Sequence, residues 1–291
     1  MKRLIALFLC MIFLCGCSQI NNKTDKLNIV ATNFVCYDFA RAVLGDKAEI
    51  TMLIPPGSDM HAFEPSAKDI ANIHDCDLFL YIGGTTDNWA EKTLSGISDN
   101  KSIRLIDTVT LIKNGETYDE HVWGSPENAI KMINAILEKT CEIDANNSDL
   151  YRKNAKDYIE KIDSAEQKTK SVIDSAKVKK IVVADRFPLI YFTEYYGLEY
   201  EAAFGGCEHD TDASLHTVAH LIDSVKEDKL TAVYRIGGSG LSVADAVSKG
   251  TGAKILKLNS YQNISADQFK NGITYIDIMN KNAETLREGL N

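Results

Sequence analysis

Hydrophobic positions along the chain form short apolar runs separated by longer amphipathic stretches. The runs are typical of buried strands and cover residues 27–31, 48–54, 78–82, 102–106, 180–184, 200–204, 232–236 and 254–258. Most are separated by helical patterns, at residues 34–44, 66–71, 189–196, 213–226 and 243–249. Strands that alternate with helices form parallel sheets, so the pattern predicts an α/β fold with two Rossmann-like lobes.

A long helical region separates the two sets of strands. Residues 127–176 have a helical pattern with a break near 144–147, and residues 150–173 contain neither Gly nor Pro. A helix of that length is a rod of roughly 36 Å, long enough to run along both lobes. The predicted parts are an N-terminal lobe over 27–143, a linking backbone helix over 144–178 and a C-terminal lobe over 179–291.

Such a rod leaves little scope for hinge motion and places a cleft between the two lobes. In open α/β sheets, ligands bind in the crevice at the carboxyl ends of the strands. The loops that follow strands are therefore the first places to look for functional side chains.

The N-terminal segment has a different pattern. Two basic residues precede an apolar run over residues 4–14, which is about half of what a bilayer span needs, and the run leads into Leu-Cys-Gly-Cys, ending at Cys17. The motif resembles a bacterial lipobox and predicts a signal peptide over 1–16, lipidation of Cys17 and a polar tether over 17–26. The alternative is a plain secretory peptide. We expect a mature protein anchored by lipid to the extracytoplasmic face of the cell membrane.

The net charge and the cysteine spacing argue against nucleic acid as a partner and against one kind of metal site. The 32 Lys and Arg residues are outnumbered by 41 Asp and Glu residues, and no basic stripe is visible, which argues against nucleic acid as a partner. Cys36, Cys76, Cys141 and Cys207 are widely spaced without a CxxC motif, so a Cys-rich zinc site is not expected, and their pairing stays open.

Two of the six histidines lie in loops that should face the cleft. His61 follows the strand near residue 54 in a loop stiffened by Pro and Gly, and His121 follows the fourth strand, between acidic residues and Trp123. Imidazole is the commonest metal ligand and favours borderline divalent cations such as zinc. From position alone, a hydrogen-bonded structural histidine is an equally good interpretation of each.

The other histidines are weaker candidates. His216 and His220 have the i, i+4 spacing of metal ligands, but they lie opposite the apolar positions Leu215, Val218, Ile222 and Val225. We interpret them as part of a solvated helix face, and His74 as a surface residue.

The segments around His61 and His121 resemble a known family. Pro-Gly-x-Asp-x-His-x-Phe-Glu-Pro-Ser at residues 56–66 and Asp-x-His-x-Trp-x-Ser-Pro at residues 119–126 are similar to signatures of the metal-binding receptors of bacterial ABC importers, the zinc/manganese or ZnuA/TroA-like class. The resemblance extends over nearly the whole mature chain. It implies two α/β lobes on a rigid backbone helix, with His61 and His121 as metal ligands in the cleft between the lobes.

The family implies two further ligands, and this sequence departs from the pattern at both. The third place, usually His or Glu, falls on Ala184-Asp185, so Asp185 is the nearest donor, although a salt bridge with Arg186 is an alternative role. The late acid falls near Asn259, which offers only a neutral carbonyl. The loop after Phe204 contains Glu208 and His209, and we expect one of them to complete the site; an acidic surface turn is an equally good interpretation.

The resemblance implies the function, and the ligand set bears on the choice of metal. Two or three histidines with a carboxylate suit tetrahedral Zn²⁺, and more oxygen ligands would favour Mn²⁺. Zinc is preferred, although the His-rich loop common in zinc receptors is absent between residues 111 and 119. We expect a monomeric substrate-binding lipoprotein, not an enzyme, that delivers the metal to an ABC permease. The ATPase is a separate chain, because no GxxxxGK[ST] motif occurs.

Two other functions use the same residues. An exported metallohydrolase would need Glu120 or Glu64 as a base, and no HExxH motif supports it. A receptor for a metal chelate would use aromatic and Arg side chains, and the paired His loops argue against it.

Overall fold

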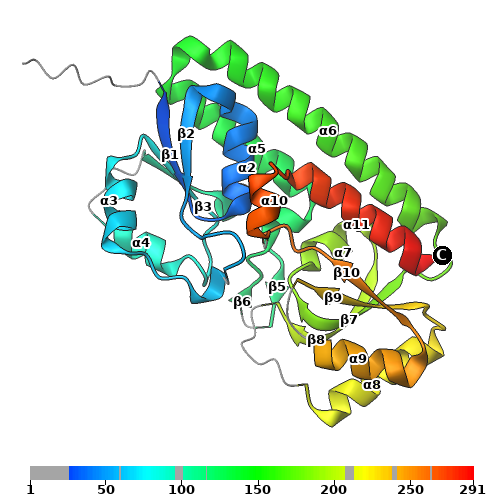
Figure 1. Ribbon diagram of the computed structural model, residues 1–291. Coiled ribbons are helices and arrows are strands. Elements are labelled where there is room, and N and C mark those ends of the chain that lie inside the picture. The colour runs from blue at the N-terminus through cyan, green and yellow to red at the C-terminus, as the bar shows by residue number, and fades with distance from the viewer. Residues whose placement is uncertain are drawn as a thin grey trace, which may run out of the picture.

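The computed structural model describes residues 26–58, 60–95, 101–115, 117–206, 213–237, 241–262 and 264–291 (Figure 1). The predicted signal peptide with Cys17, nearly all of the tether, and the loop with Glu208 and His209 lie outside these ranges. Within them, none of the helices combines the length and the apolar character needed to cross a membrane.

Two four-stranded parallel sheets form the two halves of the fold, as predicted. The first has the order β2-β1-β3-β4 and the second the order β10-β9-β7-β8. Their strands are β1 (Leu27–Ala31), β2 (Ala48–Met52), β3 (Leu78–Tyr81), β4 (Ser102–Arg104), β7 (Lys180–Phe187), β8 (Glu199–Gly205), β9 (Ala232–Ile236) and β10 (Lys254–Leu258). All eight expected strands are present, and β7 continues three residues beyond its predicted end.

Helices pack around both sheets. They are α2 (Phe34–Leu44), α3 (Ala67–Asp75), α4 (Asn88–Leu94), α5 (Pro126–Ile143), α6 (Ser148–Ser175), α7 (Ile190–Tyr196), α8 (Leu215–Glu227), α9 (Leu241–Thr251), α10 (Ala266–Lys270) and α11 (Tyr275–Leu290). The hydrophobic pattern alone does not predict α4, α10 or α11, nor the short hairpin of β5 (Lys113–Asn114) and β6 (Thr117–Tyr118). The prediction that Leu215 belongs to the buried apolar face of its helix is wrong, because this residue, at the start of α8, is 90% exposed.

The predicted backbone helix is α6, a single helix of 28 residues. Its buried positions recur every three or four residues and form one stripe: Tyr151, Ala155, Tyr158, Ile162, Ala165, Thr169, Val172 and Ile173. The stripe packs against α2 and α5 near one end and against α11 along the rod (Figure 1). Because a single apolar cluster includes residues of both sheets, the two halves share a core along this helix.

A buried carboxylate joins the three helices that meet at the middle of this core. Asp38 of α2 is 1% exposed and accepts hydrogen bonds from the Tyr158 hydroxyl of α6 and from the backbone N–H of Tyr275, the first residue of α11, at 2.7 Å. It also pairs with Arg41, whose guanidinium donates to the carbonyl of Ile273 at 2.7 Å. The chain is thereby fixed at three points that are far apart in sequence.

We expect Asp38→Ala to lower the free energy of unfolding by about 2–4 kcal/mol, because it leaves buried donors of Tyr158 and Tyr275 unsatisfied. Urea denaturation followed by circular dichroism measures the change. Asp157→Ala, on the exposed face of α6, is the matched control and should have little effect. Equal stability of the two variants would contradict the importance of the junction.

A second buried carboxylate shapes the loop after β3. Asp87 Oδ2 accepts hydrogen bonds from the backbone N–H groups of Ile82 and Gly83, at 2.9 and 3.1 Å. Burial is the main cause that raises the pKa of Asp87 to about 6, and the nearby charge of Glu120 adds to it, against the two N–H donors. The native state therefore binds a proton at Asp87 more tightly than the unfolded chain does.

Ionising Asp87 should cost the native state stability as the pH rises from about 4 to about 6. A shift of about two units corresponds to roughly 3 kcal/mol. We therefore expect the stability of Asp87→Asn relative to wild type to increase across this window, in urea titrations of metal-free protein at several pH values. Asp107→Asn, at an exposed position near β4, should show no such trend. A pH-independent difference for Asp87→Asn would refute the raised pKa.

Candidate metal centre

His61 lies on the wall of a cavity between the two halves of the molecule. It belongs to a short 3-10 helix, Met60–Ala62, that follows β2 and the rigid Pro55-Pro56 segment. Met60 is buried beneath it, and the ring of Phe63 packs edge-on against Trp89 with centroids 5.5 Å apart. The His61 side chain is only 11% exposed, so its ring is held in a restricted environment.

His121 is completely buried and is oriented by the acidic residue two positions before it. Asp119 Oδ1 accepts a hydrogen bond from the His121 backbone N–H at 2.8 Å and lies 3.0 Å from His121 Nδ1. A carboxylate at this place holds the proton on Nδ1, which leaves the lone pair of Nε2 for a cation. Among the described residues, Nε2 has no hydrogen-bond partner.

Asp119 stays ionised in spite of its burial. Desolvation by itself raises the pKa of this carboxyl, but the hydrogen bonds and charge of His121, with a further donor on Asn114, outweigh it and leave the pKa below its ordinary value. The Tyr191 hydroxyl donates to the Asp119 carbonyl at 2.9 Å and so fixes the backbone of this turn to α7. Asp119 is therefore a rigid, negatively charged support for His121.

The two imidazoles lie side by side. Their centroids are 6.2 Å apart and their planes are inclined by 61°. With metal–nitrogen bonds of about 2.0–2.1 Å, two imidazoles that bind one tetrahedral ion have centroids roughly 5–5.5 Å apart. The two rings of this half are therefore within about 1 Å of the separation that a shared tetrahedral cation requires.

A threonine that the sequence analysis missed connects His61 to a second carboxylate. The Thr86 hydroxyl lies 3.0 Å from His61 Nδ1 and donates a hydrogen bond to Glu120 Oε1, while the Thr86 N–H donates to Glu120 Oε2 at 2.9 Å. Since the hydroxyl proton is directed to Glu120, the hydroxyl oxygen accepts from Nδ1–H of His61. Each imidazole thus has its Nδ1 supported by an acid, directly at His121 and through Thr86 at His61.

Two glycines make room for these contacts. A Cβ on Gly84, whose φ is +88°, would lie 2.5 Å from Glu120 Oε2. A Cβ on Gly206 would lie 3.0 Å from the Phe187 carbonyl and 3.1 Å from His121 Cε1. Gly84 therefore requires the absence of a side chain beside Glu120, and a side chain at Gly206 would crowd the His121 imidazole.

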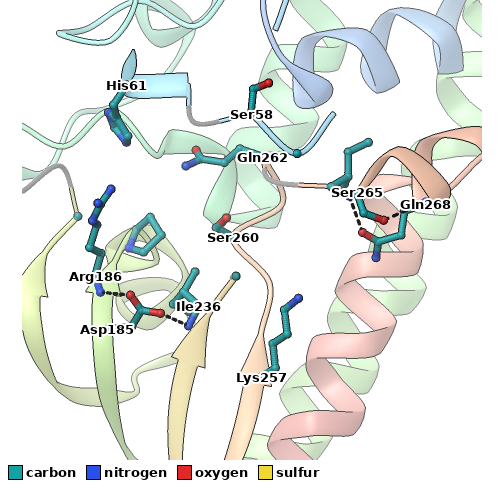
Figure 2. A pocket seen from close by; sticks show the side chains of 15 residues that line it. Ser58, His61, Asp185, Arg186, Ile236, Lys257, Ser260, Gln262, Ser265 and Gln268 are labelled. Carbon is teal, nitrogen blue, oxygen red and sulfur yellow. Dashed lines mark hydrogen bonds between the residues drawn. The ribbon is translucent and has the colours of Figure 1, made fainter. Parts of the chain in front are cut away.

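The cavity beside His61 has a volume of about 510 Å³ and is lined from both halves (Figure 2). Gly57, Ser58 and His61 come from the N-terminal half. The other half contributes Asp185, Arg186, Pro188, Gly206, Ile236, Gly237, Lys257, Ser260, Gln262, Ile264, Ser265 and Gln268. The cavity lies beyond the carboxyl ends of β7, β9 and β10, where the topology predicts a ligand site.

The other predicted ligands are placed differently. Asp185 lines the cavity, but its two oxygens accept hydrogen bonds from the N–H groups of Arg186 at 2.8 Å and Ile236 at 2.9 Å, which fixes the end of β7 to the end of β9. Asn259 bonds to Asn282 of α11 and does not line the cavity. Within the described ranges, no group of three or more His, Cys, Asp or Glu side chains is arranged to hold a metal.

The other described histidines are surface residues, in agreement with their interpretation from sequence. His74, His216 and His220 are exposed. His220 Nε2 lies 3.0 Å from Glu201 Oε2, and neither residue lines the cavity.

Comparison with known proteins identifies the family. The model of the family described as "Zinc-uptake complex component A periplasmic" matches residues 29–289. The chain is 31% identical over 297 residues to the zinc-binding lipoprotein AdcA of Streptococcus pneumoniae, covering 96% of this chain and 59% of AdcA. It is 30% identical over 287 residues to the high-affinity zinc uptake system protein ZnuA of Bacillus subtilis, covering 93% and 89% of the two chains.

The fold is also similar to that of a solved structure. The crystal structure of the Zn(II)-bound ZnuA-like domain of S. pneumoniae AdcA superposes with a TM-score of 0.79 at 32% identity, covering 91% of this chain and 99% of that domain. This chain spans about six tenths of the full length of AdcA and corresponds to that domain. With the family model matched over almost the entire described fold, the chain belongs to the family of periplasmic zinc-uptake component A proteins.

Proposed function

We propose that this chain binds a single Zn²⁺ ion as cargo between its two lobes and delivers it to the permease of an ABC importer, whose ATPase is a separate chain. The lobes are residues 27–143 and 179–291, joined by the backbone helix over 144–178. In this proposal the protein works as a monomer, held at the extracytoplasmic face of the cell membrane by a lipid on Cys17.

One observation carries the proposal: the pairing of His61 with His121 on the N-terminal side of the cleft. The ring centroids are 6.2 Å apart. Nδ1 of His121 contacts the Asp119 carboxylate, and Nδ1 of His61 contacts the Thr86 hydroxyl, which is bonded to Glu120. Nε2 of His121 is buried and has no hydrogen-bond partner among the described residues. A neutral imidazole whose Nδ1–H is held by an acid is the form that binds zinc. The geometry therefore favours metal binding over a structural role for these histidines.

We infer that further donors come from the C-terminal half. Asp185 lies at the cavity wall and brings a carboxylate to it. Glu208 or His209 would add a ligand from the loop after β8. This set of nitrogen and few oxygen donors favours Zn²⁺ over Mn²⁺. Release would follow from loss of the contacts of one lobe on docking to the permease.

The contacts of the acids argue against a metallohydrolase. Both oxygens of Glu120 accept hydrogen bonds from Thr86, and Glu64 is exposed outside the cavity lining. Neither is placed to activate water in the cavity. We therefore propose binding and transfer of the ion, without catalysis.

His61→Ala and His121→Ala should each weaken zinc binding by at least about a hundredfold, because each removes a direct ligand whose Nδ1 support alone is worth 10–100-fold. Competition with a chelator of known zinc affinity measures the change on the mature protein. His74→Ala and His216→Ala, at exposed positions, are controls and should bind as wild type does. Wild-type affinity in both cleft variants would end this proposal.

Thr86→Val should weaken zinc binding by about 10–100-fold, because it removes the hydroxyl that connects His61 to Glu120 while keeping the shape of the side chain. Thr86→Ser keeps the hydroxyl and should retain most of the affinity. The same competition assay compares the two. If Thr86→Ser binds as weakly as Thr86→Val, shape rather than the hydrogen bond is responsible.

A further inference from the structure

A second and much smaller cavity adjoins the one beside His61. Its volume is about 10 Å³, and it shares Ser58, Gln262 and Ile264 with the larger cavity. Most of its wall consists of apolar residues of the N-terminal half, such as Met60, while Gln262 and Ile264 close it from the C-terminal half. A volume of this size is about what one water molecule needs.

Asn33 lines this small cavity from the N-terminal half. It is 2% exposed and lies between β1 and α2, where its Oδ1 accepts hydrogen bonds from the N–H groups of Val35 and Cys36 at 3.0 and 3.1 Å. These bonds cap α2 and fix which end of the amide is the oxygen. The Nδ2 end is therefore a donor, and it is buried without a hydrogen-bond partner among the described residues.

Gln262 lines the same cavity from the C-terminal half. Its Oε1 is also buried, with no hydrogen-bond partner in the part of the chain that the structure describes. The backbone before it is fixed, because the Trp123 indole donates to the Ser260 carbonyl at 2.9 Å. A donor of one half and an acceptor of the other thus belong to residues that border one small space. Buried amide groups are normally paired, so both need a partner there.

The chemistry of the wall decides what that partner is. No charged side chain of the described ranges lines the small cavity, so an ion placed there would lose its hydration without compensation. The amide groups of Asn33 and Gln262 are neutral, and one offers a hydrogen while the other accepts one. A water molecule matches both, and a buried water normally makes two to four hydrogen bonds. The volume excludes any larger molecule.

We propose that one water molecule binds in this cavity, accepts a hydrogen bond from Asn33 Nδ2 and donates one to Gln262 Oε1. This interlobe water bridge joins the loop after β1 to the loop after β10, beside the metal cavity. Because separating the two halves breaks the bridge, it slows the opening of the cleft and the release of the ion. The bridge itself does not involve the metal, and only its effect on release rests on the proposed function.

A crystal structure of the metal-free protein, at a resolution that shows ordered water, tests the bridge directly. We expect one water oxygen within roughly 3.2 Å of both Asn33 Nδ2 and Gln262 Oε1. A cavity without water, or an amide of Asn33 or Gln262 that is paired with another protein group instead, would overturn the proposal.

Release kinetics test what the bridge does. Asn33→Ser keeps an acceptor that caps α2 but removes the amide donor, and Gln262→Leu removes the acceptor oxygen. Each should speed the release of zinc into excess chelator, measured by stopped flow, by about three- to tenfold, which corresponds to the loss of one hydrogen bond. Gln268→Leu is the matched control, because Gln268 lines only the larger cavity, and its release rate should stay within about twofold of wild type.

The double variant separates a shared bridge from two independent effects. If one water joins the two side chains, Asn33→Ser combined with Gln262→Leu should release zinc no more than about twofold faster than the faster single variant. Single effects that multiply, or a fast Gln262→Leu beside an unchanged Asn33→Ser, would overturn the proposal, because Gln262 would then act without Asn33. Zinc binding that depends on His61 and His121 would leave the proposed function intact in that case.

Discussion

The hydrogen bond from the Trp123 indole to the Ser260 carbonyl joins the two halves of the protein at the site itself. The same turn holds His121, and the Tyr275 hydroxyl donates to the Trp123 carbonyl at 2.6 Å, so this turn is also bonded to the start of α11. Tyr275 in turn donates its N–H to Asp38 on α2. A series of buried hydrogen bonds thus runs from the turn that holds His121 to the helices around α6. The position of His121 depends on the packing of the entire core as much as on its own loop.

Three acidic residues lie near the two histidines, one in direct contact with an imidazole and two farther away. Asp119 contacts His121 directly, Glu120 acts on His61 through Thr86, and Asp87 lies behind the same loop, where burial and the charge of Glu120 raise its pKa. Negative charge is therefore concentrated behind the imidazoles, while the groups that line the cavity on the other side include Arg186 and Lys257. Such an arrangement attracts a cation to the histidines and orients their lone pairs toward it.

Much of this architecture follows from local sequence. The apolar runs at Ile29 and Ile181 predict parallel strands, the absence of Gly and Pro predicts α6, and loops after strands predict the placement of His61 and His121. The partners of those histidines were not predictable, because Thr86 meets Glu120 across 34 residues and the contact depends on how two loops pack. Asn259 shows the limit most clearly. The resemblance assigns it to the late ligand, but its backbone is bonded to Asn282 of α11 and it does not line the cavity.

Nε2 of His121 is buried and has no hydrogen-bond partner among the described residues, and this has a thermodynamic consequence for the metal-free protein. A desolvated acceptor without a donor weakens the native state, and an ion that binds only the folded chain restores that free energy by mass action, about 2.7 kcal/mol at a hundredfold excess over Kd. Cargo and fold are therefore coupled. If the ion is the zinc of the proposed function, a population short of zinc would unfold more often and be degraded faster, so the abundance of the protein itself would vary with the supply of that ion.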